Sequence, residues 1–164
     1  MKKTIINFIS TFITTFIVVI ALLLILVKVT GCSMYTIESS SMAPELQVGT
    51  LVVVKPTEFE EIETGDIISY VLNEKGTIVT HRVTDIDESS ESFTTKGDMN
   101  DAEDAAVVYY ENVIGVVIFK IPYIGNVFKI IQNHKKMTLG LVFILLIGTI
   151  ISNLITKIKQ EKTR

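Results

Sequence analysis

Three short stretches of the chain carry residue types from which a hydrolytic site can be built. Serines occupy residues 39–41, a histidine follows at His81, and an acidic stretch covers residues 96–104. A serine hydroxyl is a weak nucleophile that needs a base within hydrogen-bond reach, and that base needs a third group to hold its tautomer. The three stretches therefore contain the minimum set for a Ser-His-Asp triad, in which the order along the chain is free.

Each stretch also has an ordinary structural interpretation. A serine cluster after an apolar segment is commonly a linker, a single histidine on a strand commonly packs or faces water, and an Asp/Asn/Gly loop is commonly a solvated turn. The acidic stretch has oxygen ligands suited to Ca²⁺, but it lacks the twelve-residue EF-hand pattern that ends in Glu. The spacing alone leaves these alternatives open beside the triad.

Two apolar segments flank this set. The first, from Ile5 to Val29, has no charge before Lys28. At about 1.5 Å per residue it is long enough to cross a hydrocarbon core of roughly 30 Å. The second, from Leu139 to Ile155, is only just long enough. We therefore predict transmembrane helices over residues 4–29 and 137–156.

A secretory signal is one alternative for the first segment, but signal h-regions are usually shorter, about 7–15 residues. A lipobox is another, because Val29-Thr30-Gly31-Cys32 resembles one, and lipidation of Cys32 would remove the segment. The basic ends, residues 1–3 and 157–164, favour cytoplasmic termini. The expected protein lies in the plasma membrane, with an extracytoplasmic catalytic domain over residues 30–136.

The charge of the middle of the chain restricts its partners. Residues 31–136 carry 17 Asp and Glu against 8 Lys and Arg, whereas the chain as a whole has a net charge of −3. An acidic domain is a poor nucleic-acid binder, since that function needs a basic surface. Cys32 is the single cysteine, which excludes an internal disulfide and a cysteine-based metal site.

The pattern between the apolar segments predicts a mainly β domain. Short β-branched or alternating runs recur about every ten residues and are separated by Gly, Asn and Pro. They are expected at residues 51–54, 66–71, 77–83, 92–96 and 113–119. A weak helical turn is expected at 58–62 and a helix at 124–132. Strands of this number and spacing favour a small β-barrel or sandwich.

Five short motifs follow one another along the chain: Ser41-Met42-Ala43-Pro44, Gly65-Asp66-Ile67-Ile68, His81-Arg82-Val83, Thr95 through Asn100, and Pro122-Tyr123-Ile124-Gly125. Together they cover residues 39–125 beside the two-span layout. In this order they resemble the motifs of the type I signal peptidases of the endoplasmic-reticulum kind, found in eukaryotes, archaea and some Gram-positive bacteria.

The resemblance implies a membrane-bound serine endopeptidase that removes signal peptides from exported pre-proteins. Ser41 matches the nucleophile, and His81 stands where the other branch of the family has a lysine base. Asp98 and Asp104 match the two carboxylates of the acidic loop. Asp104 is favoured as the partner of His81, because Asp98 sits beside Gly97 in a turn. Ser39 matches a position whose hydroxyl assists the oxyanion hole.

The resemblance also bears on partners and on rival functions. It implies pre-proteins, the bilayer and secretion machinery as partners, with no metal or cofactor. Two departures from the family pattern are Ser40 in place of a glycine and Met99 in place of an asparagine. The alternatives weighed are a catalytically inactive membrane protein, a binding protein lipidated at Cys32, and a self-cleaving Ser-Lys regulator of related fold.

Overall fold

The computed structural model describes residues 2–134 and, beyond them, residues 136, 140, 142–144, 147–151, 155 and 158. The chain divides into two compact units. One unit, residues 28–130, contains the sheet and every candidate site residue. The other consists of Met1–Val27 with Ile131–Arg164.

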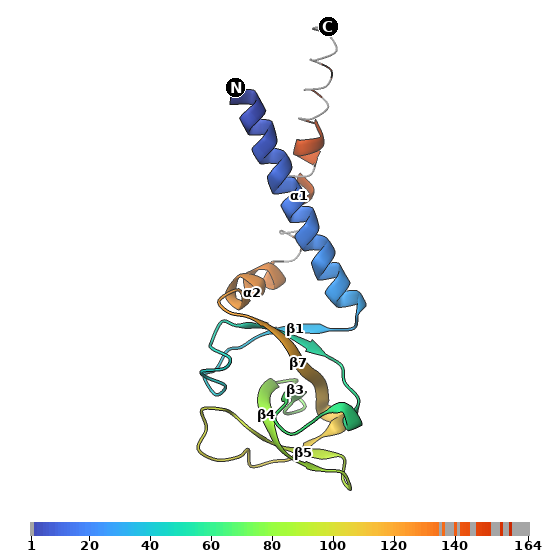
Figure 1. Ribbon diagram of the computed structural model, residues 1–164, viewed down its shortest axis with the longest axis vertical. Coiled ribbons are helices and arrows are strands. Elements are labelled where there is room, and N and C mark those ends of the chain that lie inside the picture. Colours follow the sequence, from blue (N-terminus) through green and yellow to red (C-terminus); the bar gives the residue numbers. More distant parts are fainter. Residues whose placement is uncertain are drawn as a thin grey trace. The chain divides into compact units, whose positions relative to one another are not determined.

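A seven-stranded antiparallel sheet forms the unit of residues 28–130 (Figure 1). Its strand order is β1-β2-β7-β3-β4-β5-β6. The strands are β1 (Ser33–Thr36), β2 (Leu51–Lys55), β3 (Ile67–Val71), β4 (Ile78–Asp87), β5 (Ser92–Lys96), β6 (Val108–Tyr109) and β7 (Val113–Ile121). Short 3-10 helices cover Phe59–Glu61 and Tyr110–Asn112, and α2 covers Gly125–Asn133. The mainly β prediction is thus confirmed.

Irregular register bends the sheet where β7 passes from β2 to β3. The register shifts between Val53 and Val54 in β2 and between Ser69 and Tyr70 in β3. Gly115 lies in this region with φ +148°, and a Cβ there would fall 2.0 Å from the Lys55 carbonyl oxygen. Only glycine allows the two strands to approach this closely, so the bend depends on the absence of a side chain.

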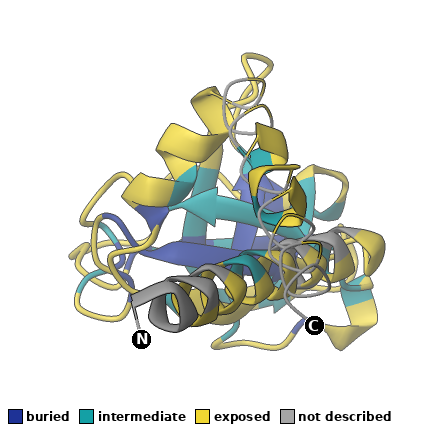
Figure 2. Cartoon of the chain, turned by 90° about the horizontal axis from the view of Figure 1, so that it is seen from above, coloured by how far each residue is buried: buried dark blue, intermediate teal, exposed yellow. Residues whose placement is uncertain are grey.

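Two groups of buried residues pack against the sheet. Figure 2 colours the buried stretches of the chain dark blue. The first lies against β3, β4 and β5 and contains Ile62, Ile68, Tyr70, Val83, Phe93 and Val108. The second lies against β2 and contains Ile37, Met42, Leu46, Val52 and Val54. The β-branched content of the strands suits a pleated, half-buried surface. The first group lies beside His81, and the second contains Met42, which follows Ser41.

Strand pairing puts three polar residues on one face of the sheet. His81 pairs with Ile68, which is two residues from Tyr70 on β3. Thr95 pairs with Val83, which is two residues from His81 on β4. Because alternate residues of a strand share a face, Tyr70, His81 and Thr95 all face the first buried group.

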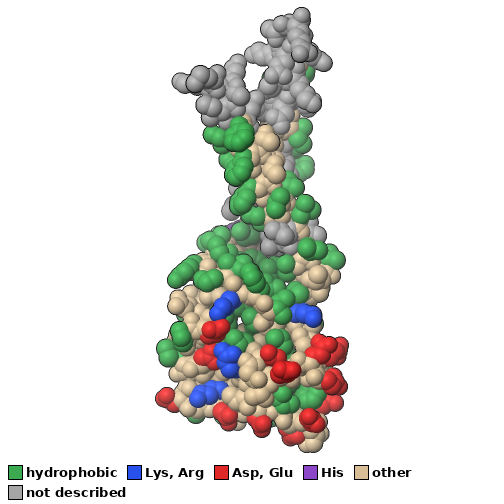
Figure 3. Space-filling model, in the orientation of Figure 1, with side chains coloured by type: hydrophobic (Ala, Val, Ile, Leu, Met, Phe, Trp, Pro, Cys, Tyr) green, Lys and Arg blue, Asp and Glu red, His purple; other side chains and the backbone are tan. Residues whose placement is uncertain are grey.

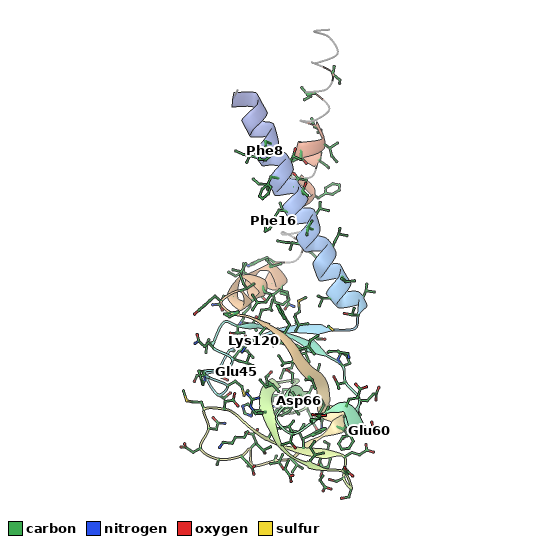
Figure 4. All side chains as sticks on the ribbon, in the orientation of Figure 1. Phe8, Phe16, Glu45, Glu60, Asp66 and Lys120 are labelled. Atoms are coloured by element: carbon green, nitrogen blue, oxygen red, sulfur yellow. The ribbon has the colours of Figure 1, made fainter. Side chains whose placement is uncertain are left out.

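The helix α1 covers Lys2–Val29, 28 residues. Its run of apolar residues contains neither proline nor glycine, and Phe8 and Phe16 extend from its surface (Figure 4). Within the part of the chain that the structure describes, no helix reaches the combined length and hydropathy needed to span a bilayer. Half of the second predicted span, residues 137–156, lies outside the described residues.

Acidic side chains gather over the unit of residues 28–130, on the face seen in Figure 3. Basic side chains on this face are few, and some are neutralised: Lys120 pairs with Glu45 at 2.6 Å (Figure 4). The acidic balance read from the sequence is therefore a property of the folded surface.

Candidate active site

The turn that carries Ser41 is anchored by its neighbours. Met42 is 1% exposed and Leu46 is fully buried, and both pack in the group against β2. Two backbone hydrogen bonds close the turn, from Ala43 N–H to Ser40 C=O at 2.9 Å and from Leu46 N–H to Met42 C=O at 2.7 Å. With its flanking residue buried, Ser41 stays partly exposed in a fixed position.

His81 reaches the serine from the middle of β4. Its Nε2 atom lies 3.1 Å from the Oγ atom of Ser41, forty residues earlier in the chain. The residue is 8% exposed, and β3 and β5 pair with β4 on either side. A histidine in a central strand cannot swing far, so the imidazole meets the serine without rearrangement.

Asp104 completes the set from the loop that follows β5. Its Oδ2 atom lies 2.6 Å from Nδ1 of His81. The loop doubles back on the strand it left, because Asp104 N–H donates to Thr95 C=O at 2.8 Å. Burial acts to raise the pKa of Asp104, but hydrogen bonds from His81, Thr95 and Tyr70 outweigh it. The pKa of this carboxyl therefore lies below its usual value, and it is ionised at neutral pH.

An ionised Asp104 settles the roles of the two ring nitrogens. A carboxylate can only accept hydrogen bonds, so His81 Nδ1 carries a proton and donates it. In the neutral ring Nε2 is then unprotonated and accepts from the Ser41 hydroxyl. This is the arrangement in which an imidazole can remove a proton from a serine as the serine attacks.

Asp98 lies elsewhere, against Arg82. The Arg82 guanidinium donates two hydrogen bonds to it, from Nε at 2.8 Å and from Nη2 at 2.7 Å. A third, from Nη1, reaches the Gly65 carbonyl at 2.8 Å. Two parallel bonds between a guanidinium and a carboxylate are among the stronger polar contacts in proteins. Asp98 thus ties its loop to β4 and to the turn before β3, and Asp104 is the carboxylate at His81.

The loop that contains Asp98 also contacts the backbone of Ser41. Met99 N–H donates to Ser41 C=O at 2.8 Å. Gly97 passes so close that a Cβ there would lie 2.8 Å from the same carbonyl oxygen and 2.8 Å from the Asn100 side chain. Only a glycine at position 97 leaves room for the acidic loop to lie directly against the serine turn.

Ser39 lies beside the nucleophile position, with 3.1 Å between its Oγ and that of Ser41. Because the Ser41 hydroxyl donates to His81, Ser39 is the donor of this contact. The backbone N–H of Ser41 has no acceptor among the described residues. A free N–H and a nearby hydroxyl are the groups from which an oxyanion hole is made.

The two departures from the family pattern are accommodated. Ser40 does not have a positive φ, so a side chain at this position introduces no backbone strain. Met99 is 62% exposed and contributes its backbone N–H, which any residue except proline supplies. Neither departure removes a candidate catalytic residue, since Ser41, His81 and Asp104 are all present.

Two residues of the site escaped the sequence analysis as functional residues. Thr95 Oγ1 donates to Asp104 Oδ2 at 2.6 Å, and Tyr70 O–H donates to the same atom at 3.3 Å. The only available signal was the place of Thr95 just before Lys96-Gly97-Asp98. Nothing in the local sequence of Tyr70 indicates a role.

A cavity of about 350 Å³ lies against the His81–Asp104 pair. His81, Asp104 and Tyr70 border it, and Val79 and residues 105–108 form most of the remaining wall. Ser41 is not part of the lining. The cavity therefore gives solvent access to the carboxylate rather than to the serine.

Comparison with known proteins gives this geometry a context. A sequence model of the family "Signal peptidase, peptidase S26" matches residues 8–94, more than half of the chain. The chain belongs to the peptidase S26 signal peptidase family. Ser41 and His81 lie inside the matched region, and Asp104 lies beyond its end.

Individual relatives of the family come from both bacteria and eukaryotes. Signal peptidase I W of Bacillus subtilis (strain 168) is 41% identical over 88 residues, which are 52% of this chain and 46% of that protein. The signal peptidase complex catalytic subunit SEC11 of Metarhizium robertsii is 28% identical over 122 residues, 66% of this chain and 71% of that one. SEC11C of Rattus norvegicus is 26% identical over 117 residues, 65% and 61%. The aligned part thus spans less than half of the Bacillus relative.

Proposed function

We propose that this protein is a serine endopeptidase that removes N-terminal signal peptides from exported pre-proteins. The observation that carries the proposal is the continuous chain of contacts from Ser41 Oγ through both His81 nitrogens to Asp104 Oδ2. Ser41 is the nucleophile, His81 the general base and then general acid, and Asp104 the group that orients the ring. Membership of the signal peptidase family supports the substrate class.

In the acylation step, His81 Nε2 takes the Ser41 proton while Oγ attacks the scissile carbonyl. The resulting imidazolium is stabilised by the adjacent Asp104 carboxylate, which stays ionised. The oxyanion accepts hydrogen bonds from the free N–H of Ser41 and from the Ser39 hydroxyl. His81 then gives its proton to the leaving amine, and the signal peptide remains esterified to Ser41.

Deacylation reverses these roles with water in place of the amine. His81 removes a proton from water, the hydroxide attacks the ester, and the proton returns to Ser41. Asp98 takes no part in proton transfer in this scheme. Its bond to Arg82 keeps the loop against the Ser41 carbonyl, so that the nucleophile does not drift.

The cleavage segment is expected to bind as an added strand beside the serine turn. β1 is an edge strand and leads directly to the serine cluster. Between them, Glu38 and Ser39 make no backbone hydrogen bond to any described residue. An extended peptide can pair with such a segment, and the small residues of a signal-peptide cleavage site place its scissile bond at Ser41.

Membrane anchoring is a further part of the proposal. It is supported by the uncharged stretch between Lys3 and Lys28 and by the basic residues at both ends of the chain. The proposed order is a cytoplasmic end at residues 1–3, spans at 4–29 and 137–156, an outer domain at 30–136 and a cytoplasmic tail at 157–164. Enzyme and pre-protein would then meet in one plane, which favours encounter.

Cleavage of a labelled pre-protein tests the proposed activity. Purified full-length chain in liposomes is compared with Ser41→Ala and with Ser40→Ala, the matched control one residue away. We expect cleavage at a small-x-small site by the wild type and Ser40→Ala, and none by Ser41→Ala. Cleavage that persists in Ser41→Ala would show that another group is the nucleophile.

The single cysteine allows a separate test of topology. Cys32 follows the first predicted span and is expected outside, where a membrane-impermeant maleimide labels it in intact cells. A Cys32→Ser chain with Lys2→Cys should be labelled only after the cells are opened. Equal labelling of both positions in intact cells would contradict the orientation, and a mass spectrum showing a lipidated Cys32 would replace the first span by a lipid anchor.

A further inference from the structure

We propose that Tyr70 and Thr95 are positioning residues of the active site, whose hydroxyl groups hold the Oδ2 atom of Asp104 in line with His81. The inference rests on the proposed triad and adds two members to the machinery behind it. Neither residue touches the reacting atoms, and both act through Asp104.

The contacts converge on one oxygen atom. Asp104 Oδ2 lies 2.6 Å from Thr95 Oγ1, 3.3 Å from the Tyr70 hydroxyl and 2.6 Å from His81 Nδ1. Three donors aimed at one atom fix the rotation of the carboxylate as well as its position. Without the two hydroxyls, rotation about the side chain would let either oxygen, or none, face the imidazole.

Burial makes these hydroxyls reliable donors. Thr95 is fully buried, and Tyr70 is 3% exposed. The two hydroxyl oxygens lie 3.3 Å apart, so each limits the rotation of the other. Burial also raises the pKa of Tyr70 to about 12, which keeps its phenol protonated, and therefore a donor, at any pH at which the enzyme would be assayed.

The carboxylate needs this support because water can reach it. The Asp104 side chain is 21% exposed and borders the 350 Å³ cavity. Its backbone lies in a loop, not in a strand. Water molecules in the cavity would compete for the carboxylate, and fixed donors from β3 and β5 outcompete them without the entropy cost of ordering a solvent molecule.

Matched substitutions separate the hydroxyl from its packing. Thr95→Val removes the hydroxyl and keeps the shape, whereas Thr95→Ser keeps the hydroxyl. We expect Thr95→Val to lower kcat about tenfold, which is the scale of one hydrogen bond to a charged group, and to change KM less than about twofold. Thr95→Ser should retain kcat within about threefold of the wild type. Tyr70→Phe, with the longer contact, should lower kcat by less than Thr95→Val.

Two controls remove hydroxyls that do not touch Asp104. Tyr110→Phe loses a phenol that bonds Thr57 and Glu58 beside the same buried group, and Thr84→Val loses a hydroxyl that bonds Thr94 on the neighbouring strand. Both should keep wild-type kcat. Thermal unfolding of each variant reports whether it folds.

A second readout does not depend on cleavage. The chain has two histidines, so the Nδ1 proton of His81 can be assigned in NMR spectra of the full chain in micelles by comparison with His134→Gln. In a Ser41→Ala background, Thr95→Val and Tyr70→Phe should shift this resonance, and Tyr110→Phe should not. The signal remains informative even if the pre-protein is not the substrate.

The outcomes are distinct. A lowered kcat and a shifted resonance in Thr95→Val, restored in Thr95→Ser, establish the positioning role. An unmoved resonance with wild-type kcat would overturn it, and so would an equal loss in Thr95→Ser, which would assign the effect to packing. A third outcome is that every variant, Ser41→Ala included, still cleaves the pre-protein while the NMR resonance shifts as expected. This would contradict the proposed function and leave the positioning role intact.

Discussion

The Asp104 carboxylate lies 2.6 Å from the imidazole of His81, although the two residues are 23 positions apart and lie on different elements. Asp98, on the same loop, is bound to Arg82 instead. The two carboxylates of the acidic stretch therefore have separate tasks, one beside the proposed base and one holding the loop. This division makes their substitutions distinguishable.

Asp104→Asn is expected to lower kcat/KM for pre-protein cleavage by at least about a hundredfold, the scale of a lost acid–base partner. The amide cannot stabilise an imidazolium, and its NH₂ group can turn Nδ1 into an acceptor and so protonate Nε2. The measurement is a kinetic comparison with the wild type at neutral pH. Near-normal activity of Asp104→Asn would remove this residue from the triad.

Asp98→Asn is expected to have a smaller effect on the same assay, about tenfold, with a lowered melting temperature. The substitution leaves one acceptor for Arg82 where the wild type has two, so the loop is loosened but no proton-transfer group is lost. Arg82→Lys should behave similarly, because an ammonium cannot form the two parallel bonds. A loss as large as that of Asp104→Asn would mean that Asp98 has a direct role in the reaction.

The lowered pKa of Asp104 predicts a dependence of folding stability on acid pH. A carboxyl whose folded-state pKa lies below its unfolded value of about 3.9 stabilises the fold above that pH. This stabilisation is lost as the pH falls from about 5 through the lower, folded-state pKa. Urea unfolding at several pH values should therefore show a steeper acid loss in the wild type than in Asp104→Asn. Parallel curves would contradict the shift.

Gly97→Ala is expected to reduce cleavage strongly while the protein remains folded. The added methyl would meet the Ser41 carbonyl at 2.8 Å, so either the serine turn or the acidic loop must move. A displacement of about 1 Å at a reacting group can cost a hundredfold in rate. Gly140→Ala, where a Cβ would meet nothing within 4 Å, is the matched control and should be fully active. Equal activity of the two variants would show that the loop tolerates the shift.

Ser39→Ala tests the assignment of the oxyanion hole. Removal of one donor from such a site is expected to lower kcat by about a hundredfold or somewhat more, with KM little changed. Ser40→Ala, an exposed neighbour, again serves as the control. An increase in rate on removal of Ser39 would show instead that its hydroxyl restrains Ser41 in the resting enzyme.

Much of the fold was readable from local pattern. The strands at residues 51–55, 67–71, 92–96 and 113–121 match the predicted runs to within two residues at each end, and α2 begins one residue after its predicted start. β1 and β6 were not predicted, because strands of four and two residues carry too little periodicity. β4 is longer than predicted and continues to Asp87, because pairing with β5 extends it through polar residues.

The sequence by itself determined the chemistry available to this protein. It contains a serine in a signal peptidase motif and a histidine at the position of the family's general base. It also contains two candidate carboxylates and an acidic segment between two apolar ones. These properties depend on the types of residues and on their order over short stretches of chain, and both can be read directly from the sequence.

Only the tertiary structure decided which groups meet. The pairing of Arg82 with Lys96, and the loop that returns Asp104 to the backbone of Thr95, place one carboxylate beside His81 and the other beside Arg82. The pairing of Ile68 with His81, between β3 and β4, places Tyr70 on the face of His81. A slip of one residue would turn each of these side chains to the opposite face, and register is set by the packing of the whole sheet, which no short segment encodes.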